Sequence, residues 1–311
     1  MTNSTVLDSH FTAVINAIRE GRLIPFLGAG ANLCGRPKIT WTPKDGYLPS
    51  GKELATHLAN ISSYKISHND ELLHVSQYVS TMEGTGPLYQ RLHDVFDYDY
   101  RSNPLHACLA SLSSKLQQKN YPSLLIVTTN YDDVLEQLFT ATNEPYDLFT
   151  YIADDRTHSG KFRHKAPGAQ HESIVTNPNE HQGLDLAKRS AIVKIHGTVS
   201  RNSKTADNDS YVITEDHYID YLSQASQIPS DIMSRFQRGQ FLFLGYGLRD
   251  WNLRVILRRI EREQNQTYRS WAIQSKPTPL ESRFWATHDI EILDMDLHDY
   301  IPMLNMALQV L

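Results

Sequence analysis

Four short apolar runs in this chain each end in a polar or glycine-containing motif. The runs cover residues 23–27, 124–129, 191–195 and 241–244. The motifs that follow them are Gly28-Ala29-Gly30, Asn130-Tyr131-Asp132, His196-Gly197 and Gly245-Tyr246-Gly247. Continuous apolar runs of this length are typical of strands buried on both faces of a parallel sheet. Because open α/β sheets bind ligands at the carboxyl ends of their strands, the pattern predicts one site that gathers all four motifs.

The rest of the chain alternates helical patterns with further strands. Apolar runs at 270–274 and 289–293 predict two more strands. Helical spacing is found at residues 11–20, 52–61, 70–81, 88–96, 105–117, 133–140, 214–225, 229–237 and 251–264. This alternation predicts an α/β protein with a Rossmann-like, doubly wound parallel sheet, in a single domain over residues 1–311. We expect residues 31–123 to form a helical insertion covering the sheet edge, and the polar residues 154–189 to form a loop or lid.

Composition and charge exclude several classes of function. The 311 residues carry a formal net charge of −5, so direct nucleic-acid binding is not expected. Only Cys34 and Cys108 occur, too few for a disulfide framework or a four-cysteine zinc site, and we expect chemistry without a metal. Residues 1–10 lack an apolar signal core, and no stretch reaches the roughly 18 apolar residues of a membrane span. These features predict a cytoplasmic protein without membrane contact.

The first glycine motif is a candidate phosphate-binding loop. A strand followed by Gly28-Ala29-Gly30 lets backbone amides approach a pyrophosphate with no Cβ in the way. The full dinucleotide fingerprint requires a third small residue where Leu33 stands, and Gly35 and Pro37 would disrupt a regular helix here. An ordinary dehydrogenase is therefore disfavoured. A tight glycine turn without a ligand is the alternative.

The second motif places an amide and a carboxylate directly after a buried strand. The Asn130 amide can orient a water molecule or a ribose hydroxyl without carrying charge. The alternative is helix capping, since Asn130, Asp132 and Asp133 are all favoured at a helix start. Two acids also make this helix terminus an unfavourable seat for phosphate, so we expect a pyrophosphate at one of the glycine loops.

His196 is the preferred general base. It follows an apolar strand, and Gly197 next to it would leave room for a ligand beside the imidazole. The alternative is a packed structural histidine. Four other histidines lie in the polar segment without the spacing of metal ligands and are interpreted as a solvated loop: His158, His164, His171 and His181.

The fourth motif again suits close approach of backbone to a nucleotide. Gly245-Tyr246-Gly247 precedes a helix that Asp250 could cap, and Arg249 and Asn252 would lie near the ligand or at the helix start. Capping and surface charge are the alternative for these polar residues.

In this order and strand context, the motifs resemble the signature of the sirtuin-like domain family over residues 10–300. The carrying stretches are 27–30, 128–132, 194–197 and 243–250. The resemblance implies that Asn130 holds the nicotinamide ribose and a catalytic water, that Asp132 meets the nicotinamide carboxamide, and that His196 acts as base. The NAD-binding candidates are then Gly28, Ala29, Gly30, Thr128, Thr129, Gly245, Tyr246, Gly247, Arg249 and Asp250.

Departures from the family pattern narrow the expected activity. Protein deacylases of this family have a four-cysteine zinc ribbon and a Pro-Asp-Phe-Arg stretch, whereas this chain has no ribbon and carries Cys34-Gly35-Arg36-Pro37 at that place. It is more similar to the divergent, zinc-free sirtuin-like proteins of prokaryotic antiphage defence. That resemblance implies an NAD glycohydrolase that cleaves its substrate NAD to nicotinamide and ADP-ribose and depletes the cell of NAD.

Two alternatives remain open at this point. One is an NAD-dependent protein deacylase or ADP-ribosyltransferase, and the absent zinc residues count against it. The other is a non-catalytic subunit that binds NAD or ADP-ribose, and Asn130 and His196 count against it because a binder would need only the glycine turns. The resemblance also implies a homo-oligomer, with a separately encoded DNA-translocating ATPase or short Argonaute as a partner.

Overall fold

The structure, a computed structural model, describes residues 2–62, 64–65, 71–155, 157–181, 183–201, 203–223, 228–246 and 268–311, and of residues 2–5 and 222–223 the backbone alone. A sheet of nine described strands lies at the centre, in the order β11-β10-β9-β1-β2-β6-β3-β4-β5. Its strands are β1 (Leu23–Leu27), β2 (Leu125–Thr128), β3 (Tyr146–Tyr151), β4 (Phe162–Lys165), β5 (Ser173–Ile174), β6 (Ser190–Lys194), β9 (Gln240–Leu244), β10 (Ser270–Gln274) and β11 (Ile290–Asp294). All neighbours from β11 to β3 pair in parallel, and β4 and β5 add antiparallel strands at one edge.

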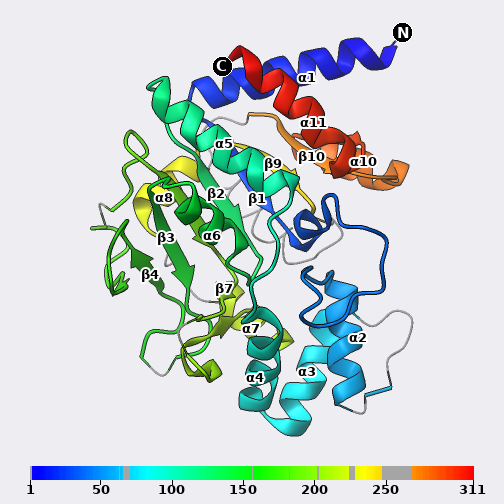
Figure 1. Ribbon diagram of the computed structural model, residues 1–311, viewed down its shortest axis with the longest axis vertical. Coiled ribbons are helices and arrows are strands. Elements are labelled where there is room, and N and C mark those ends of the chain that lie inside the picture. Colours follow the sequence, from blue (N-terminus) through cyan, green and yellow to red (C-terminus); the bar gives the residue numbers. More distant parts are fainter. Residues whose placement is uncertain are drawn as a thin grey trace.

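Helices cover both faces of this sheet. In β1, Leu23 and Leu27 pack into one core cluster and Ile24 and Phe26 into another, as the alternation of side chains along a strand requires. The first face is covered by α1 (Thr2–Arg19), α5 (Pro104–Gln118), α6 (Val134–Ala141) and α11 (Leu297–Ala307), and the second by α8 (Ser230–Phe236) and α10 (Pro279–Ala286). The predicted α/β, Rossmann-like, doubly wound parallel sheet is therefore confirmed (Figure 1).

The sheet brings the four sequence motifs to one edge. Strands β9, β1, β2 and β6 are consecutive neighbours, and their last residues are in register: Leu27 lies opposite Thr128 and Leu244, and Thr128 lies opposite Lys194. The chain moves outward from β1 through β2 on one side and adds β9, β10 and β11 on the other. A reversal of this kind is where doubly wound sheets form a ligand crevice.

A small helical lobe stands beside this edge. It consists of α2 (Gly51–Ile61), α3 (Leu72–Glu83) and α4 (Thr85–Phe96), which share a separate core cluster and lie at the bottom of the view in Figure 1. The predicted insertion over 31–123 also included α5, but the side chains of Leu105 and Leu109 pack in the core of the sheet layer. The 3-10 turn η1 (Ala29–Leu33) leads from β1 toward the lobe.

The polar segment 154–189 contains strands where the pattern predicts only a loop. Strands β4 and β5 lie in it and pair antiparallel, extending the sheet beyond β3.

Strand β3 is not predicted by the hydrophobic pattern because it contains a fully buried aspartate, Asp147. The Asp147 carboxylate lies 2.6 Å from Arg189 Nε and 2.9 Å from His164 Nε2. A further pair of short strands, β7 (Gly197–Thr198) and β8 (Ser210–Tyr211), and helix α7 (Glu215–Ser223) follow β6.

Two of the four histidines of this segment do not form the solvated loop that the sequence predicts. His164 and His181 are largely buried, their rings contact one another at 3.3 Å, and Asp147 and Asp231 bind their other nitrogens. His171 is exposed. Their partners come from β3 and α8, so the sequence offers no local sign of this cluster.

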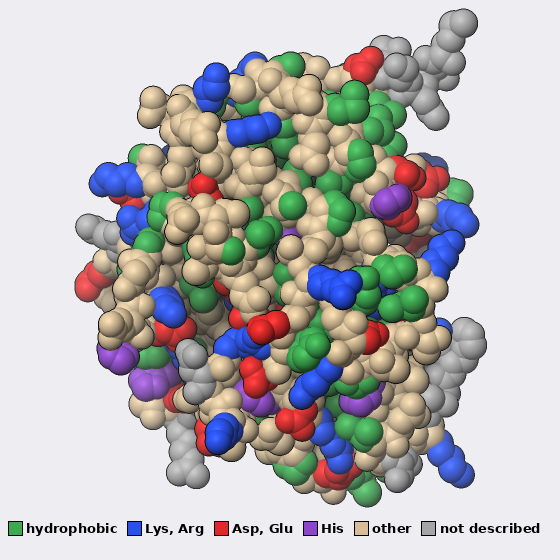
Figure 2. Space-filling model, in the orientation of Figure 1, with side chains coloured by type: hydrophobic (Ala, Val, Ile, Leu, Met, Phe, Trp, Pro, Cys, Tyr) green, Lys and Arg blue, Asp and Glu red, His purple; other side chains and the backbone are tan. Residues whose placement is uncertain are grey.

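On the face drawn in Figure 2, acidic and basic side chains are interspersed, without a broad surface of one charge. Within the described part of the chain, no helix has both the length and the hydropathy needed to cross a bilayer.

Candidate active site

A cavity of about 390 Å³ lies at the carboxyl ends of β9, β1, β2 and β6, bordered on its far side by α2 and α3. This volume lies in the range of small-molecule sites. The predicted residues that line it are Gly28, Ala29, Gly30, Thr129, Asn130, Asp132, His196, Gly245 and Tyr246. The candidates Gly247, Arg249, Asp250 and Asn252, with the helix predicted over 251–264, lie outside the described residues.

Thr128 supports the cavity from below. Its buried hydroxyl donates a hydrogen bond to the Leu27 carbonyl at 3.2 Å and accepts one from the backbone N–H of Asn130 at 3.0 Å. These bonds fasten the start of the turn to β1. Thr128 is not among the described residues that line the cavity, so the direct contact with NAD predicted for it is not supported by this geometry.

The glycines of the first and fourth motifs pack against each other. Gly28 N–H donates to the Leu244 carbonyl at 3.1 Å, and Gly30 N–H donates to the Gly245 carbonyl at 2.8 Å. A Cβ on Gly30 would lie 2.6 Å from the Gly245 oxygen. Glycine is therefore required here by the contact between two turns, and these two amides are already engaged instead of facing a pyrophosphate.

Asp132 lines the cavity and also bonds the first residue of α6, although the N-cap position itself is occupied by Asp133. Its Oδ1 accepts the Val134 amide at 3.2 Å at the start of α6, as the capping alternative predicts, while Oδ2 accepts Asn32 Nδ2 at 2.8 Å. Because an ionised carboxylate only accepts, this contact fixes the orientation of the Asn32 amide. The Asn32 Oδ1 atom is then buried without a hydrogen-bond partner among the described residues.

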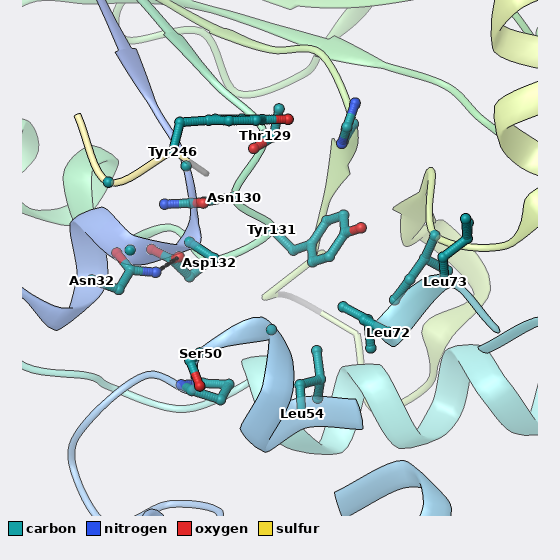
Figure 3. Close-up of a pocket in the computed structure, with 18 of the residues that line it drawn as sticks. Asn32, Ser50, Leu54, Leu72, Leu73, Thr129, Asn130, Tyr131, Asp132 and Tyr246 are labelled. Carbon is teal, nitrogen blue, oxygen red and sulfur yellow. Dashed lines mark hydrogen bonds between the residues drawn. The ribbon is translucent and has the colours of Figure 1, made fainter. Parts of the chain in front are cut away.

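Asn32 lines the cavity, although no sequence motif identifies it as a site residue. It lies in η1, and the only available signal was an amide just after the glycine loop. In Figure 3, Asn32, Asp132 and Asn130 gather at one end of the cavity, with the Asn32–Asp132 bond drawn between two of them. The cavity therefore offers an acceptor that the four sequence motifs do not contain.

Three leucines line the opposite side of the cavity, together with the polar residues Ser50 and Glu71. Leu54 from α2 and Leu72 and Leu73 from α3 lie opposite the polar group in Figure 3. Phe96, Ile213 and Tyr218 also line the cavity. Helical apolar residues of this kind look the same in sequence whether they face a core or a ligand, so no pattern could have identified them.

His196 also lines the cavity, with only 3% of its surface exposed. The rings of Tyr218 and Tyr221 meet its imidazole edge-on at 5.4 and 5.9 Å. Burial lowers the pKa of His196 to about 3, which keeps the ring neutral at physiological pH. Its Nε2 has no hydrogen-bond partner among the described residues. The structure thus brings the predicted amide and imidazole into one cavity.

Gly197 has a different purpose from the one expected. Its φ is +86°, and a Cβ there would lie 2.0 Å from the Ser210 carbonyl oxygen. The glycine is therefore needed for the close pairing of β7 with β8.

Among the described residues, no group of three or more His, Cys, Asp or Glu side chains is arranged to hold a metal ion. Both cysteines are buried free thiols, and burial raises the pKa of Cys34 to about 11 and that of Cys108 to about 12. Neither thiol is therefore a nucleophile at neutral pH.

Comparison with known proteins places this arrangement in a family. The profile of the SIR2-like domain matches residues 124–293, more than half of the chain. The chain belongs to the SIR2-like domain family. The match begins at the strand before Asn130, includes His196, and extends into β11. The predicted sirtuin-like resemblance is confirmed.

Relatives of this SIR2-like chain are longer proteins. It is 23% identical over 299 residues to defense-associated sirtuin 2 of Bacillus subtilis, covering 93% of this chain and 25% of that protein. It is 27% identical over 261 residues to the NAD(+) hydrolase ThsA of Acinetobacter baumannii, covering 82% and 43% of the two chains. The corresponding figures for the NAD(+) hydrolase ThsA of Cytobacillus dafuensis are 26% over 265 residues, with 83% and 41% covered. The chain thus spans less than half the length of these relatives.

Burial of His196 predicts a loss of stability in mild acid. The pKa of His196 is about 3 in the folded chain and about 6.5 when unfolded. Between these values the unfolded chain binds one more proton, so the free energy of unfolding falls as the pH drops below 6.5, by at most about 1.4 kcal/mol per pH unit. We expect His196→Gln to reduce the difference in urea stability between pH 7 and pH 5.5.

The matched control for this titration is His171→Gln, which alters an exposed histidine. It should leave the pH dependence as in the parent protein. An equal pH dependence in the His196→Gln and parent proteins would show that His196 is not held neutral by the fold.

Proposed function

We propose that this chain hydrolyses the N-glycosidic bond of NAD, releasing nicotinamide and ADP-ribose, and that the reaction depletes NAD during antiphage defence. The observation that carries the proposal is geometric: His196, whose Nε2 lacks a partner among the described residues, lines the same cavity as Asn130. The names of two relatives, both NAD(+) hydrolases, support this reaction, and the name of the third, a defense-associated sirtuin, supports the role in defence.

The reaction passes through an oxocarbenium-like ribose, as other glycosidic cleavages do. The C1′–N bond breaks and its electron pair stays on the ring nitrogen, so nicotinamide leaves as a neutral molecule. A water oxygen then bonds to C1′. In our proposal the Asn130 amide orients that water and the ribose hydroxyls, and His196 takes the proton that the water loses.

The leaving group meets the Asn32–Asp132 pair in this proposal. The acceptor oxygen of Asn32 is fixed by Asp132 and is suited to the N–H donors of the nicotinamide carboxamide. Asp132 then contributes in two ways: it contacts the carboxamide itself, and it orients the Asn32 amide that binds the carboxamide. The apolar wall from α2 and α3 excludes bulk water from the cationic sugar.

The test is product analysis after incubation of the purified chain with NAD. We expect free nicotinamide and ADP-ribose in equal amounts, without any added peptide. Release that depends on an acylated lysine peptide would indicate a deacylase, and transfer of ADP-ribose to protein would indicate a transferase. Micromolar NAD binding without turnover, also in the presence of the remaining parts of a longer protein, would indicate a binding subunit.

The proposed homo-oligomer has its own measurement. Size-exclusion chromatography with light scattering, with and without NAD, should give a mass above the 35.5 kDa of one chain. The ATPase or short Argonaute partner remains a proposal based on family resemblance.

A further inference from the structure

A lysine that is not among the residues lining the cavity is completely buried at the end of β6. Lys194 is the last residue of β6, and its side chain has no exposed surface. Lysine is almost never fully buried unless it is paired, because removing an ammonium group from water is costly. Neither the proposed reaction nor the lining of the cavity uses this side chain. Its position therefore needs another explanation.

The Lys194 ammonium joins β6 to the segment that follows β2. It donates one hydrogen bond to the backbone carbonyl of Asp132 and another to Glu136 Oε1 at 2.7 Å. Glu136 belongs to α6, and burial raises the pKa of its carboxyl group although the Lys194 ammonium opposes this shift. One cation thus satisfies a buried carbonyl and a buried carboxyl group at the same time.

This link connects the two parts of the candidate site. The carbonyl that Lys194 holds belongs to the turn carrying Asn130 and Asp132, and His196 follows Lys194 by two positions in the same segment. Two backbone bonds also join these segments, from Ile195 N–H to the Thr128 carbonyl and from Val199 N–H to the Tyr131 carbonyl. Lys194 adds the bond at the end of the turn, where it enters α6.

We infer that Lys194 is a positioning residue: through the Asp132 carbonyl it sets the place of the Asn130-Tyr131-Asp132 turn relative to His196, without contacting the substrate. The inference rests on the proposed function for its kinetic consequence. Misplacement of reacting groups by about 1 Å can cost on the order of 10²-fold in rate, so a loose turn should slow the chemical step more than it weakens binding.

A purely structural role for the Lys194–Glu136 pair can be separated from positioning by a double variant. Replacing one member leaves the other buried and unpaired, which destabilises the fold whatever the role of the pair. Replacing both members by apolar residues of similar volume is often neutral or stabilising. In Lys194→Met with Glu136→Leu, no unpaired charge remains, and the loss of stability should be limited to that of the Asp132 carbonyl, which loses its donor.

The experiment compares this double variant with the parent protein and with Glu136→Gln. The glutamine removes the carboxyl charge, so we expect a lower Tm. It keeps an acceptor for Lys194 and leaves the bond to Asp132 in place, so its kcat and KM should stay near the parent values. For the double variant we expect a folded protein with a modestly lower Tm, a kcat for NAD cleavage lower by about 10²-fold, and a smaller change in KM. A double variant with the parental kcat would overturn the inference.

A second readout does not depend on turnover. Hydrogen exchange of backbone amides 129–134 should be faster in the double variant than in the parent protein, with β1 and β9 exchanging equally in both. Unchanged exchange in the turn would also overturn the inference. If the parent protein fails to cleave NAD, the proposed function fails, and hydrogen exchange still decides whether Lys194 holds the turn.

Discussion

His196→Ala is expected to leave a folded protein whose NAD cleavage falls by about 10²–10⁴-fold, the usual contribution of a general base. The rate should fall because the variant lacks the imidazole that accepts the proton. The fold should persist because His196 Nε2 makes no hydrogen bond to the described residues, so no such bond is lost. The measurement is the initial rate of nicotinamide release, together with Tm to confirm folding.

The same loss is expected for Asn130→Ala, because its amide orients the water that His196 deprotonates. His171→Ala is the matched control, since it removes an exposed imidazole from the polar segment, and its rate should equal that of the parent protein. NAD cleavage at the parental rate by either cavity variant would contradict the assigned roles.

Gly245→Ala is expected to destabilise the fold by about 3 kcal/mol or more, from the sum of a left-handed backbone strain and forced overpacking. Gly245 has φ of +67°, and a Cβ there would lie 1.9 Å from the Ala31 nitrogen and 2.3 Å from the Gly30 carbonyl carbon. These neighbours are backbone atoms, so they cannot rotate away. The two glycine turns must separate, and the wall of the cavity opens with them.

Urea unfolding and NAD binding measure this effect. Gly86→Ala is the matched control because the same substitution in α4 meets nothing within 4 Å and no positive φ. It should be neutral or slightly stabilising, since alanine is favoured over glycine in a helix. If Gly245→Ala were as stable as Gly86→Ala, the close contact between the turns would be wrong.

The site could be predicted in outline because its residues follow strands in the sequence. The motifs at Gly28, Asn130, His196 and Gly245 were expected at one sheet edge, and the structure places them around one cavity. The reasons for individual residues were less predictable. Gly197 is required by the β7–β8 pairing, and the backbone N–H groups of Gly28 and Gly30 donate to carbonyls of Leu244 and Gly245.

Strand β3 shows why part of the fold escaped prediction. Asp147 interrupts its apolar pattern, and the groups that compensate its buried charge, Arg189 and His164, come from elsewhere in the sequence. The role of Lys194 could not be predicted for the same reason. The sequence shows a lysine within an apolar strand, but not that its ammonium group is buried against a carboxylate in α6.

The sequence by itself determined the elements whose signal is local. Continuous apolar runs specify buried parallel strands, and the polar residue after each run specifies the edge where a ligand can bind. Only the tertiary structure decided the contacts between distant segments. Asn32 and Asp132 are 100 positions apart, and Lys194 and Asp132 are 62 apart. Such pairs produce no periodic pattern in the sequence. Their hydrogen bonds depend on how close the groups lie in space, and that distance is set by the packing of distant segments.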